Sequence, residues 1–222
     1  MDVAGGPPLV VVADTANSFQ GGSWSADGTI LFVAAKSLRR VSASGGNPSD
    51  VDLEGSGGKE AVRDSPEFFP DGRHFLYVVR APGHRDELRV GSLDSKSTTP
   101  AWFDRSGNAL GSITQPAGVE YLNPSLSPDG TRLAVNSMDK GGNWDIWIVD
   151  LKSQIASRVT SDPAQDSNVV WSPDGNAIVF SSNRGGAWGL YKDGQRLLLR
   201  QPLGLPGPPV NVILNWTESL PK

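Results

Sequence analysis

Short apolar runs alternate with turn residues along most of the chain. Arg132-Leu-Ala-Val135 and Asp145-Ile-Trp-Ile-Val149 are apolar runs of this kind, and the polar loop Asp139-Lys-Gly-Gly-Asn143 separates them. The second run alternates strictly, and a period of two residues indicates a half-buried β-strand. No segment of ten or more residues has a clean helical period, and 26 glycines and 17 prolines fit many tight turns. The pattern therefore predicts an all-β chain.

One turn sequence recurs along the chain. A bulky residue followed by a turn that ends in Asp-Gly occurs as Trp24–Gly28, Phe68–Gly72, Leu126–Gly130 and Trp171–Gly175. The turn aspartates are Asp27, Asp71, Asp129 and Asp174, at steps of 44, 58 and 45 residues. Roughly 40 to 50 residues per repeat, with one β-turn signal in each, is typical of a propeller or solenoid.

Each repeat divides into four predicted strands. In the clearest copy these are Asn123–Leu126, Arg132–Val135, Asp145–Val149 and Ile155–Thr160. Four antiparallel strands repeated around an axis is the propeller solution to exposed sheet edges. The longest step contains additional residues, Ala101–Ile113, which we interpret as an extra or replacement outer hairpin on the second blade.

The prediction is one domain over residues 1–222, a five-bladed β-propeller of four-stranded blades. One further step of 45 residues beyond Asp174 reaches Ser219, inside a decayed copy of the repeat. The fifth blade is expected to combine Val210–Trp216 with Leu9–Ala13, so that N- and C-terminal strands close the ring.

Composition excludes several classes of site and partner. The chain has no cysteine, which rules out disulfides, thiolate zinc sites and a cysteine nucleophile. Two histidines cannot form a histidine-rich metal centre, and a net charge of −4 argues against nucleic acid as a partner. The longest apolar stretch, Pro8–Ala13, is too short to span a membrane, and the N-terminus shows no secretory signal, so a soluble protein is expected.

The innermost strands predict where a site would lie. Aligned copies place Gly21, Ser65, Asn123 and Asn168 in one ring around the axis. The next ring holds Gln20, Asp64, Leu122 and Ser167, with Glu67, Glu120 and Asp166 nearby. Oxygen ligands without sulfur or imidazole suit Ca²⁺. The alternative is that these side chains cap turns and satisfy backbone amides.

On the calcium interpretation, the predicted ligands are Asn123, Asn168, Asp64, Ser65 and Glu120. The ion would polarise a carbonyl, and Asp64, Glu67 or Asp166 would act as general base. The recurring turn aspartates are instead expected to hold turns. The tryptophans at 24, 147, 171 and 188 are expected to pack between blades.

The Ser-Pro-Asp-Gly turns, Asp145–Asp150 and Val179–Gly185 resemble the TolB-like propellers. Gly21–Trp24, Arg40–Gly46, Pro70–Tyr77 and Val90–Asp94 are similar to the extracytoplasmic propeller regions of bacterial serine/threonine kinases, which implies a periplasmic or extracytoplasmic location. A further similarity, to calcium-dependent propeller hydrolases of homoserine lactones from metagenomes, implies quorum quenching.

Two functions from different classes follow. The first is a calcium-dependent hydrolase of small lactones or esters, such as N-acyl homoserine lactones. The second is a non-catalytic scaffold that binds a protein or peptide on the propeller face. The turn and packing motifs do not separate them.

Overall fold

The structure is a computed structural model, and it describes residues 11–12, 19–54, 61–80, 86–99, 101–114, 119–192 and 195–197. The described residues form seventeen strands and no helix, in agreement with the predicted all-β class. None of their elements is a helix with the length and apolar character that a membrane crossing requires.

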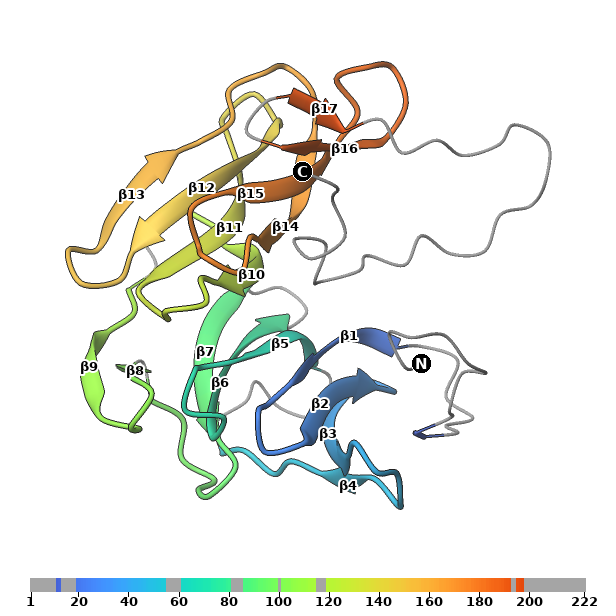
Figure 1. The fold of residues 1–222 in the computed structure, drawn as a ribbon, viewed down its shortest axis with the longest axis vertical. Coiled ribbons are helices and arrows are strands. Elements are labelled where there is room, and N and C mark those ends of the chain that lie inside the picture. Colours follow the sequence, from blue (N-terminus) through green and yellow to red (C-terminus); the bar gives the residue numbers. More distant parts are fainter. Residues whose placement is uncertain are drawn as a thin grey trace, which may run out of the picture.

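The strands form antiparallel sheets that follow chain order (Figure 1). The first sheet contains β1 (Phe19–Trp24), β2 (Thr29–Ala34), β3 (Ser37–Ser42) and β4 (Ser49–Asp50). The second contains β5 (Val62–Phe68), β6 (His74–Arg80) and β7 (Glu87–Ser92). A separate hairpin contains β8 (Ala101–Phe103) and β9 (Ala109–Ser112). The next sheet contains β10 (Leu122–Leu126), β11 (Arg132–Met138), β12 (Trp144–Asp150) and β13 (Ile155–Arg158). The last contains β14 (Asp166–Trp171), β15 (Ile178–Ser182), β16 (Gly189–Lys192) and β17 (Gln195–Leu197).

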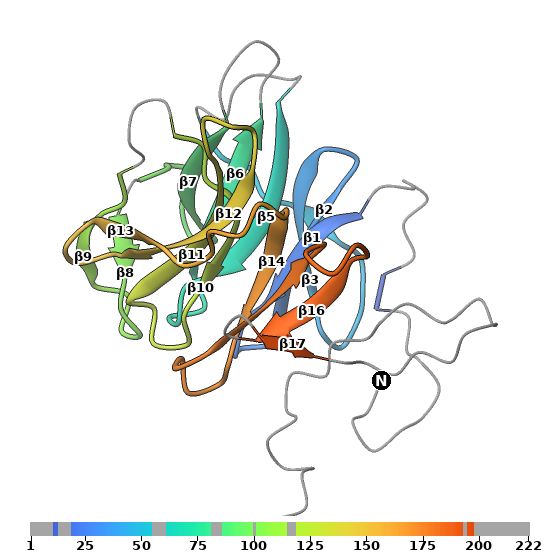
Figure 2. The same cartoon turned by 90° about the horizontal axis from the view of Figure 1, so that it is seen from above.

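The sheets are arranged as the blades of a propeller. Their first strands, β1, β5, β10 and β14, face the centre, and later strands lie progressively further out (Figures 1 and 2). Strand β5 contacts both β1 and β10, and β10 contacts β14. Four blades lie within the described residues. The predicted fifth blade and the ring closure involve Val210–Trp216 and most of Leu9–Ala13, which lie outside them.

The second blade departs from the predicted four strands. It has three, and beyond β7 a single bridge pairs Val90 with Thr99 before the chain enters the β8–β9 hairpin. This hairpin forms where the extra residues predicted one. It is joined to the blade by the Phe103 ring, which stacks on His74 with centroids 3.5 Å apart. The insertion thus takes the place of an outer strand.

Apolar side chains fill the space between successive blades. The cluster between the first and second blades includes Leu31, Val33, Phe68, Phe75 and Tyr77. A second cluster joins blade two, the hairpin and blade three, and includes Phe69, Leu76, Trp102, Leu133 and Val149. A third joins blades three and four, and includes Ala134, Ile146, Trp171, Phe180 and Tyr191. Each blade is therefore stabilised by burying its faces against its neighbours.

The expected burial of all four tryptophans between blades is wrong for two of them. At the equivalent repeat position Phe68, Leu126 and Trp171 are 9%, 7% and 9% exposed, but Trp24 is 68% exposed. Each buried residue belongs to a blade with another blade before it, whereas Trp24 belongs to the first described blade. Trp188 is 59% exposed because it lies in the loop before β16. Trp147 packs against the blade two–three cluster, as expected.

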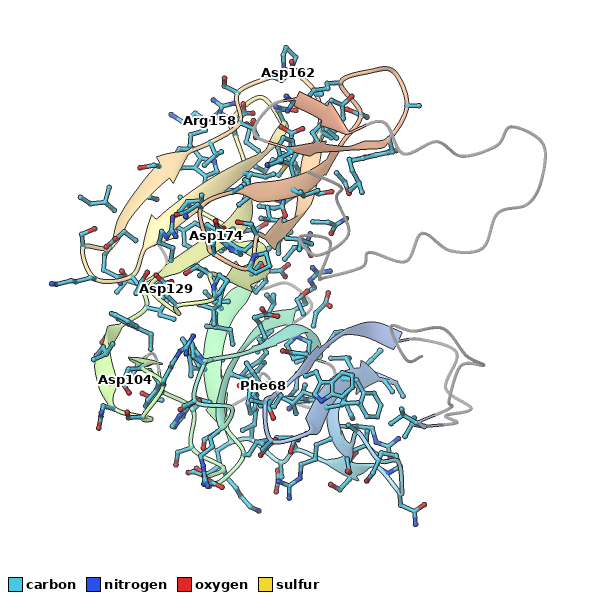
Figure 3. All side chains as sticks on the ribbon, in the orientation of Figure 1. Phe68, Asp104, Asp129, Arg158, Asp162 and Asp174 are labelled. Atoms are coloured by element: carbon cyan, nitrogen blue, oxygen red, sulfur yellow. The ribbon has the colours of Figure 1, made fainter. Side chains whose placement is uncertain are left out.

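The turn aspartates hold the turns, as expected. Each accepts a hydrogen bond from the backbone N–H two residues further on. The distances from the backbone nitrogen to the carboxylate oxygen lie between 2.9 and 3.1 Å for Asp27, Asp71, Asp129 and Asp174. In three copies a serine two residues before the aspartate donates its hydroxyl to it; the serines are Ser25, Ser127 and Ser172. Figure 3 labels Asp129 and Asp174 in these turns.

In the turn of blade two, Phe69 stands where the other turns have serine, and His74 supplies a hydrogen-bond partner for Asp71 instead. There the ring nitrogen Nδ1 of His74 lies 2.5 Å from Asp71 Oδ2, and the backbone N–H of His74 donates to Oδ1. His74 is therefore a turn residue, and its ring also supports the hairpin through the stack on Phe103.

Successive turns also pack on one another through their glycines. A β-carbon on Gly130 would lie 2.8 Å from Cγ of Pro70, in the turn of the preceding blade. A β-carbon on Gly175 would meet Pro128 Cδ at 3.6 Å, and one on Gly72 would meet Ser25 Cβ at 3.4 Å. All three glycines have positive φ, which favours glycine in the turn, and at Gly130 the close approach of Pro70 excludes a β-carbon as well.

We expect Gly130→Ala to destabilise the protein more than Gly28→Ala. Both glycines have positive φ, +71° and +89°, but nothing lies within 4 Å of a β-carbon on Gly28. Gly28→Ala should therefore cost about 1 kcal/mol for backbone strain, and Gly130→Ala about 1 to 3 kcal/mol more for displacing the Pro70 ring. Urea denaturation of both variants measures the difference. Equal losses would mean that the turns do not support one another.

Candidate functional site

Each of the four described innermost strands contains a bulge at the same repeat position. Pairing with the second strand shifts register between Phe19 and Gly22, Asp64 and Glu67, Leu122 and Ser125, and Ser167 and Val170. Inside each bulge one residue has a left-handed backbone: Gly21 (φ 78°), Ser65 (48°), Asn123 (47°) and Asn168 (54°). A bulge leaves the extra residue outside the ladder and redirects its side chain.

These bulges surround a cavity of about 490 Å³ between the innermost strands. The four bulge residues line it, together with Glu67, prolines of the second and third blades, and apolar side chains that include Leu126 and Trp171. The predicted ring of Gly21, Ser65, Asn123 and Asn168 is therefore one physical feature. The Asn side chains suit a left-handed backbone, but Ser65 adopts one that is uncommon for serine. Strain of this kind concentrates at functional sites.

Glu67 is the one ionisable side chain among the described residues that line this cavity. Burial raises the pKa of Glu67 to about 7, and the backbone N–H of Leu126, which donates to the carboxyl group, offsets part of that effect. Ser23 occupies the same repeat position in blade one, and its Oγ accepts the N–H of Phe68 at 3.0 Å. Both side chains thus bridge to the innermost strand of the next blade.

Asp64 lies next to the cavity in a group of charges at its rim. Its Oδ1 accepts the backbone N–H of Ser65 at 2.7 Å, and its Oδ2 lies 3.2 Å from Nη2 of Arg80. Arg80 also pairs with Asp86 at 3.1 Å. Burial raises the pKa of Asp86; Arg80 opposes this effect, while the carboxylates of Glu120 and Asp64 add to it. Two carboxylates, Asp64 and Asp86, therefore pair with one guanidinium here, and Glu120 lies near Asp86.

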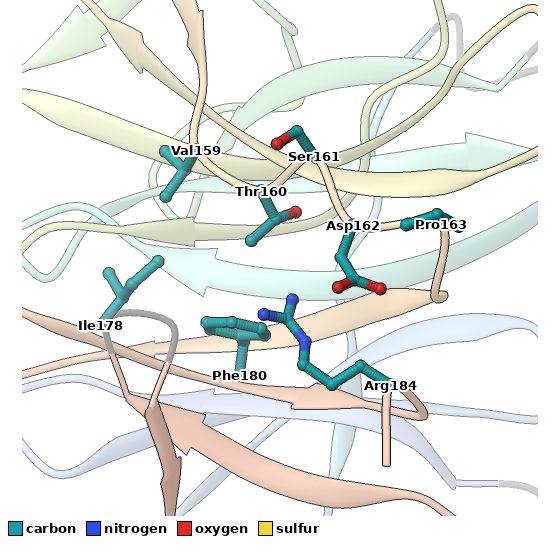
Figure 4. Close-up of a pocket in the computed structure, with 8 residues that line it drawn as sticks. All are labelled: Val159, Thr160, Ser161, Asp162, Pro163, Ile178, Phe180 and Arg184. Atoms are coloured by element: carbon teal, nitrogen blue, oxygen red, sulfur yellow. The ribbon is translucent and has the colours of Figure 1, made fainter. Parts of the chain in front are cut away.

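Asp166 is held away from the cavity. Its side chain is fully buried, and Oδ2 pairs with Nη2 of Arg184 at 2.8 Å. The guanidinium of Arg184 lies over the rings of Phe180 and Tyr191, 5.2 and 4.9 Å from their centroids. Arg184 faces a second cavity of about 620 Å³, between β15 and the loop after β13 (Figure 4). Asp166 thus anchors an arginine in the fourth blade.

The predicted calcium ligands are partly brought together. Ser65, Asn123 and Asn168 line the cavity, whereas Asp64 is paired with Arg80 and Glu120 lies in the rim group. Within the described part of the chain, no three or more Asp, Glu, His or Cys side chains form a group that could hold a metal. The present arrangement therefore offers one carboxylate and several neutral oxygens.

Sequence analysis missed the polar link between blades three and four. Asn136 on β11 is buried; its Oδ1 lies 3.4 Å from Asn123 Nδ2, and its Nδ2 donates to the backbone oxygen of Asp166 at 2.6 Å. It ties a bulge residue to the next innermost strand. The available signal was an asparagine that directly follows the buried run Leu133–Val135.

The repeats match those of a known domain family. The family model of the TolB beta propeller domain matches residues 111–196. The Tol-Pal system protein TolB of Anaeromyxobacter dehalogenans is 34% identical over 107 residues, 48% of this chain and 21% of the relative. The repeats of this chain are therefore similar to those of TolB-type β-propellers. It spans about a fifth of the length of the curated relatives it matches.

Solved structures agree with the fold assignment. A TolB-type protein from Agrobacterium tumefaciens superposes with a TM-score of 0.64 at 21% identity, covering 82% of this chain and 62% of that one. A puromycin-hydrolyzing peptidase of Mycobacterium tuberculosis superposes with a TM-score of 0.55 at 15% identity, covering 79% of this chain and 29% of that one. At these identities the likeness concerns the fold alone.

We expect the stability of this protein to fall as pH rises from about 5 to 8. The pKa of Glu67 is raised from 4.5 to about 7, so the folded state holds a proton that the unfolded state has lost. This contribution is complete below pH 4.5 and is lost as pH passes 7, a change of about 1 to 3 kcal/mol.

Glu67→Gln, which mimics the protonated carboxyl group, should remove this part of the pH dependence. Urea denaturation of both proteins at pH 5 and 8 measures it, and all other titrating groups cancel in the comparison. Parallel pH profiles would show that Glu67 is ionised in the folded protein throughout this range.

Proposed function

We propose that this TolB-like propeller is a non-catalytic module that holds a protein or peptide partner at its axial cavity. The observation that carries the proposal is the set of four equivalent bulges around one cavity. Bulges leave backbone groups outside the ladder, where they can pair with an incoming chain. Interblade packing fixes their positions beforehand, which lowers the entropic cost of binding.

The comparisons support a protein partner. The matched relatives are named as proteins of the Tol-Pal system, and the identity of 34% covers about half of this chain. We therefore propose another protein of such a system as the partner, and an extracytoplasmic location for the complex. We further propose that a fifth blade closes the ring, because the exposed Trp24 occupies a position that is buried in the other blades.

Asn168→Arg should weaken binding of a Tol-Pal partner. Asn168 lines the cavity, and an arginine there would fill space and add a charge beside the bulges. We expect its affinity for purified Pal protein of Anaeromyxobacter dehalogenans, measured by biolayer interferometry, to fall at least tenfold, which is about 1.4 kcal/mol.

Ser157→Arg is the matched control, because Ser157 is exposed on the outer strand β13. It should bind as the native chain does, and circular dichroism verifies that both variants fold. No binding by the native chain, or equal binding by Asn168→Arg, would show that the axial cavity does not receive this partner.

A second candidate function is hydrolysis of small lactones, and Glu67 favours it. A carboxyl group with a pKa near 7 inside a cavity is suited to accept a proton from an attacking water at neutral pH. Calcium-dependence stays a prediction, since Asp64 is committed to Arg80 and Ser65. Asp166 is a poor candidate for the base, because Arg184 holds it outside the cavity lining.

A lactonase assay separates the two functions. If the protein is a lactonase, it should open N-acyl homoserine lactones, Glu67→Gln should lose at least 100-fold in kcat, and Asp166→Asn should keep the native rate if folded. Repeating the assay with a chelator shows whether the rate of ring opening depends on a divalent metal ion. Ring opening no faster than in buffer would leave the binding module as the function.

A further inference from the structure

We propose that the axial cavity is a receptor for a protonated amine, and that the partner inserts a lysine side chain which pairs with Glu67. This inference rests on the proposed binding function and names the chemistry that the partner must present. It depends on three features of the cavity: the charge of its lining, the acceptors around Glu67, and the apolar wall beside them.

Within the described part of the lining there is one acidic side chain and no basic one. Glu67 is its single ionisable side chain, and the pKa of Glu67 is set by burial and the Leu126 N–H, with no contribution from an arginine or lysine. A carboxylate without a cation in a partly buried site is costly. An incoming cation would remove that cost, whereas an incoming carboxylate would add to it.

The rim has the same sign of charge. Among the described residues of this group, Asp64 and Asp86 pair with Arg80 and Glu120 lies near Asp86, which gives three carboxylates and one guanidinium beside Ser65. On the other side of the cavity, Asn123 and Asn168 are neutral, and Arg132 is engaged with the Trp171 ring and the backbone oxygen of Gly175. The field at the mouth therefore attracts cations.

The acceptors match a compact ammonium group. A lysine ammonium has three donors and one charge. Glu67 supplies one charge, and the side-chain oxygens of Ser65, Asn123 and Asn168 come from three surrounding blades. Calcium takes six to eight oxygens and usually several carboxylates, and the described residues contain no such group. One carboxylate balances an organic cation of single charge better than a divalent metal.

The wall beside the acceptors suits the lysine stem. Pro66, Pro124, Leu126, Val170 and Trp171 line the same cavity. The four methylene groups of lysine would lie against this surface while the ammonium reaches Glu67. A volume of about 490 Å³ accommodates one such side chain together with the backbone that carries it.

The test uses small probes rather than the whole partner. The native chain is titrated with Nα-acetyl-lysine methylamide and with the norleucine analogue, which keeps the stem and lacks the charge. ¹⁵N spectra report on the side-chain amides of Asn123 and Asn168. We expect saturable chemical-shift changes when the lysine probe is added to the native chain. The norleucine probe should bind the native chain at least tenfold more weakly, and the Glu67→Gln variant should bind the lysine probe at least tenfold more weakly.

Glu87→Gln is the control, because Glu87 lies on β7, exposed and paired with Arg89. It should bind the lysine probe as the native chain does. Equal affinity for both probes, or undiminished binding by Glu67→Gln, would overturn the proposal. So would a response to CaCl₂ alone with none to the lysine probe.

The amine-receptor proposal and the proposed binding function can fail independently, and the experiments distinguish the two failures. Binding of purified Pal protein that is insensitive to Glu67→Gln would reject the amine receptor and keep the binding module. Lysine-probe binding without Pal binding would reject Pal as the partner and keep the receptor.

Discussion

Burial of sheet faces between blades is the constraint on which this structure depends. A twisted four-stranded sheet has two faces, and both carry apolar side chains here, so a blade is stable when another blade covers each face. The clusters between blades one and two, two and three, and three and four meet this need. At the same repeat position Trp171, which has a described blade before it, is buried, whereas Trp24 in the first described blade is exposed.

Two further sets of contacts depend on that packing. At the turns, Gly130 and Gly175 fit against Pro70 and Pro128 of the preceding turn, so that one turn sets the position of the next. At the axis, the side chains of Ser23 and Glu67 accept backbone N–H groups from the following innermost strand. The blades are thus joined both at these turns and through the residues at the end of the innermost strands that lead into them.

The proposed binding function depends on this rigidity. Bulges cost ladder hydrogen bonds, and a left-handed serine at position 65 costs strain, yet the feature recurs in every described blade. Recurrence in a turn aspartate has a structural explanation, because the aspartate bonds its own turn. The bulges instead place polar groups around a shared space, where one buried carboxyl group gives the site its sign of charge.

The sequence by itself determined the strand order, the turns and the ring of Gly21, Ser65, Asn123 and Asn168, because these follow from a repeat whose copies obey the same local rules. It also identified Glu67 as lying near the axis, but the pKa of Glu67 depends on burial between two blades, which no local pattern encodes. Tertiary structure alone decided that Arg80 engages Asp64 and that Arg184 holds Asp166 outside the cavity. Those partners come from neighbouring strands or loops, and which charges meet depends on how the strands fold back on one another. Exposure of Trp24 was decided in the same way, since burial at that position needs a neighbouring blade.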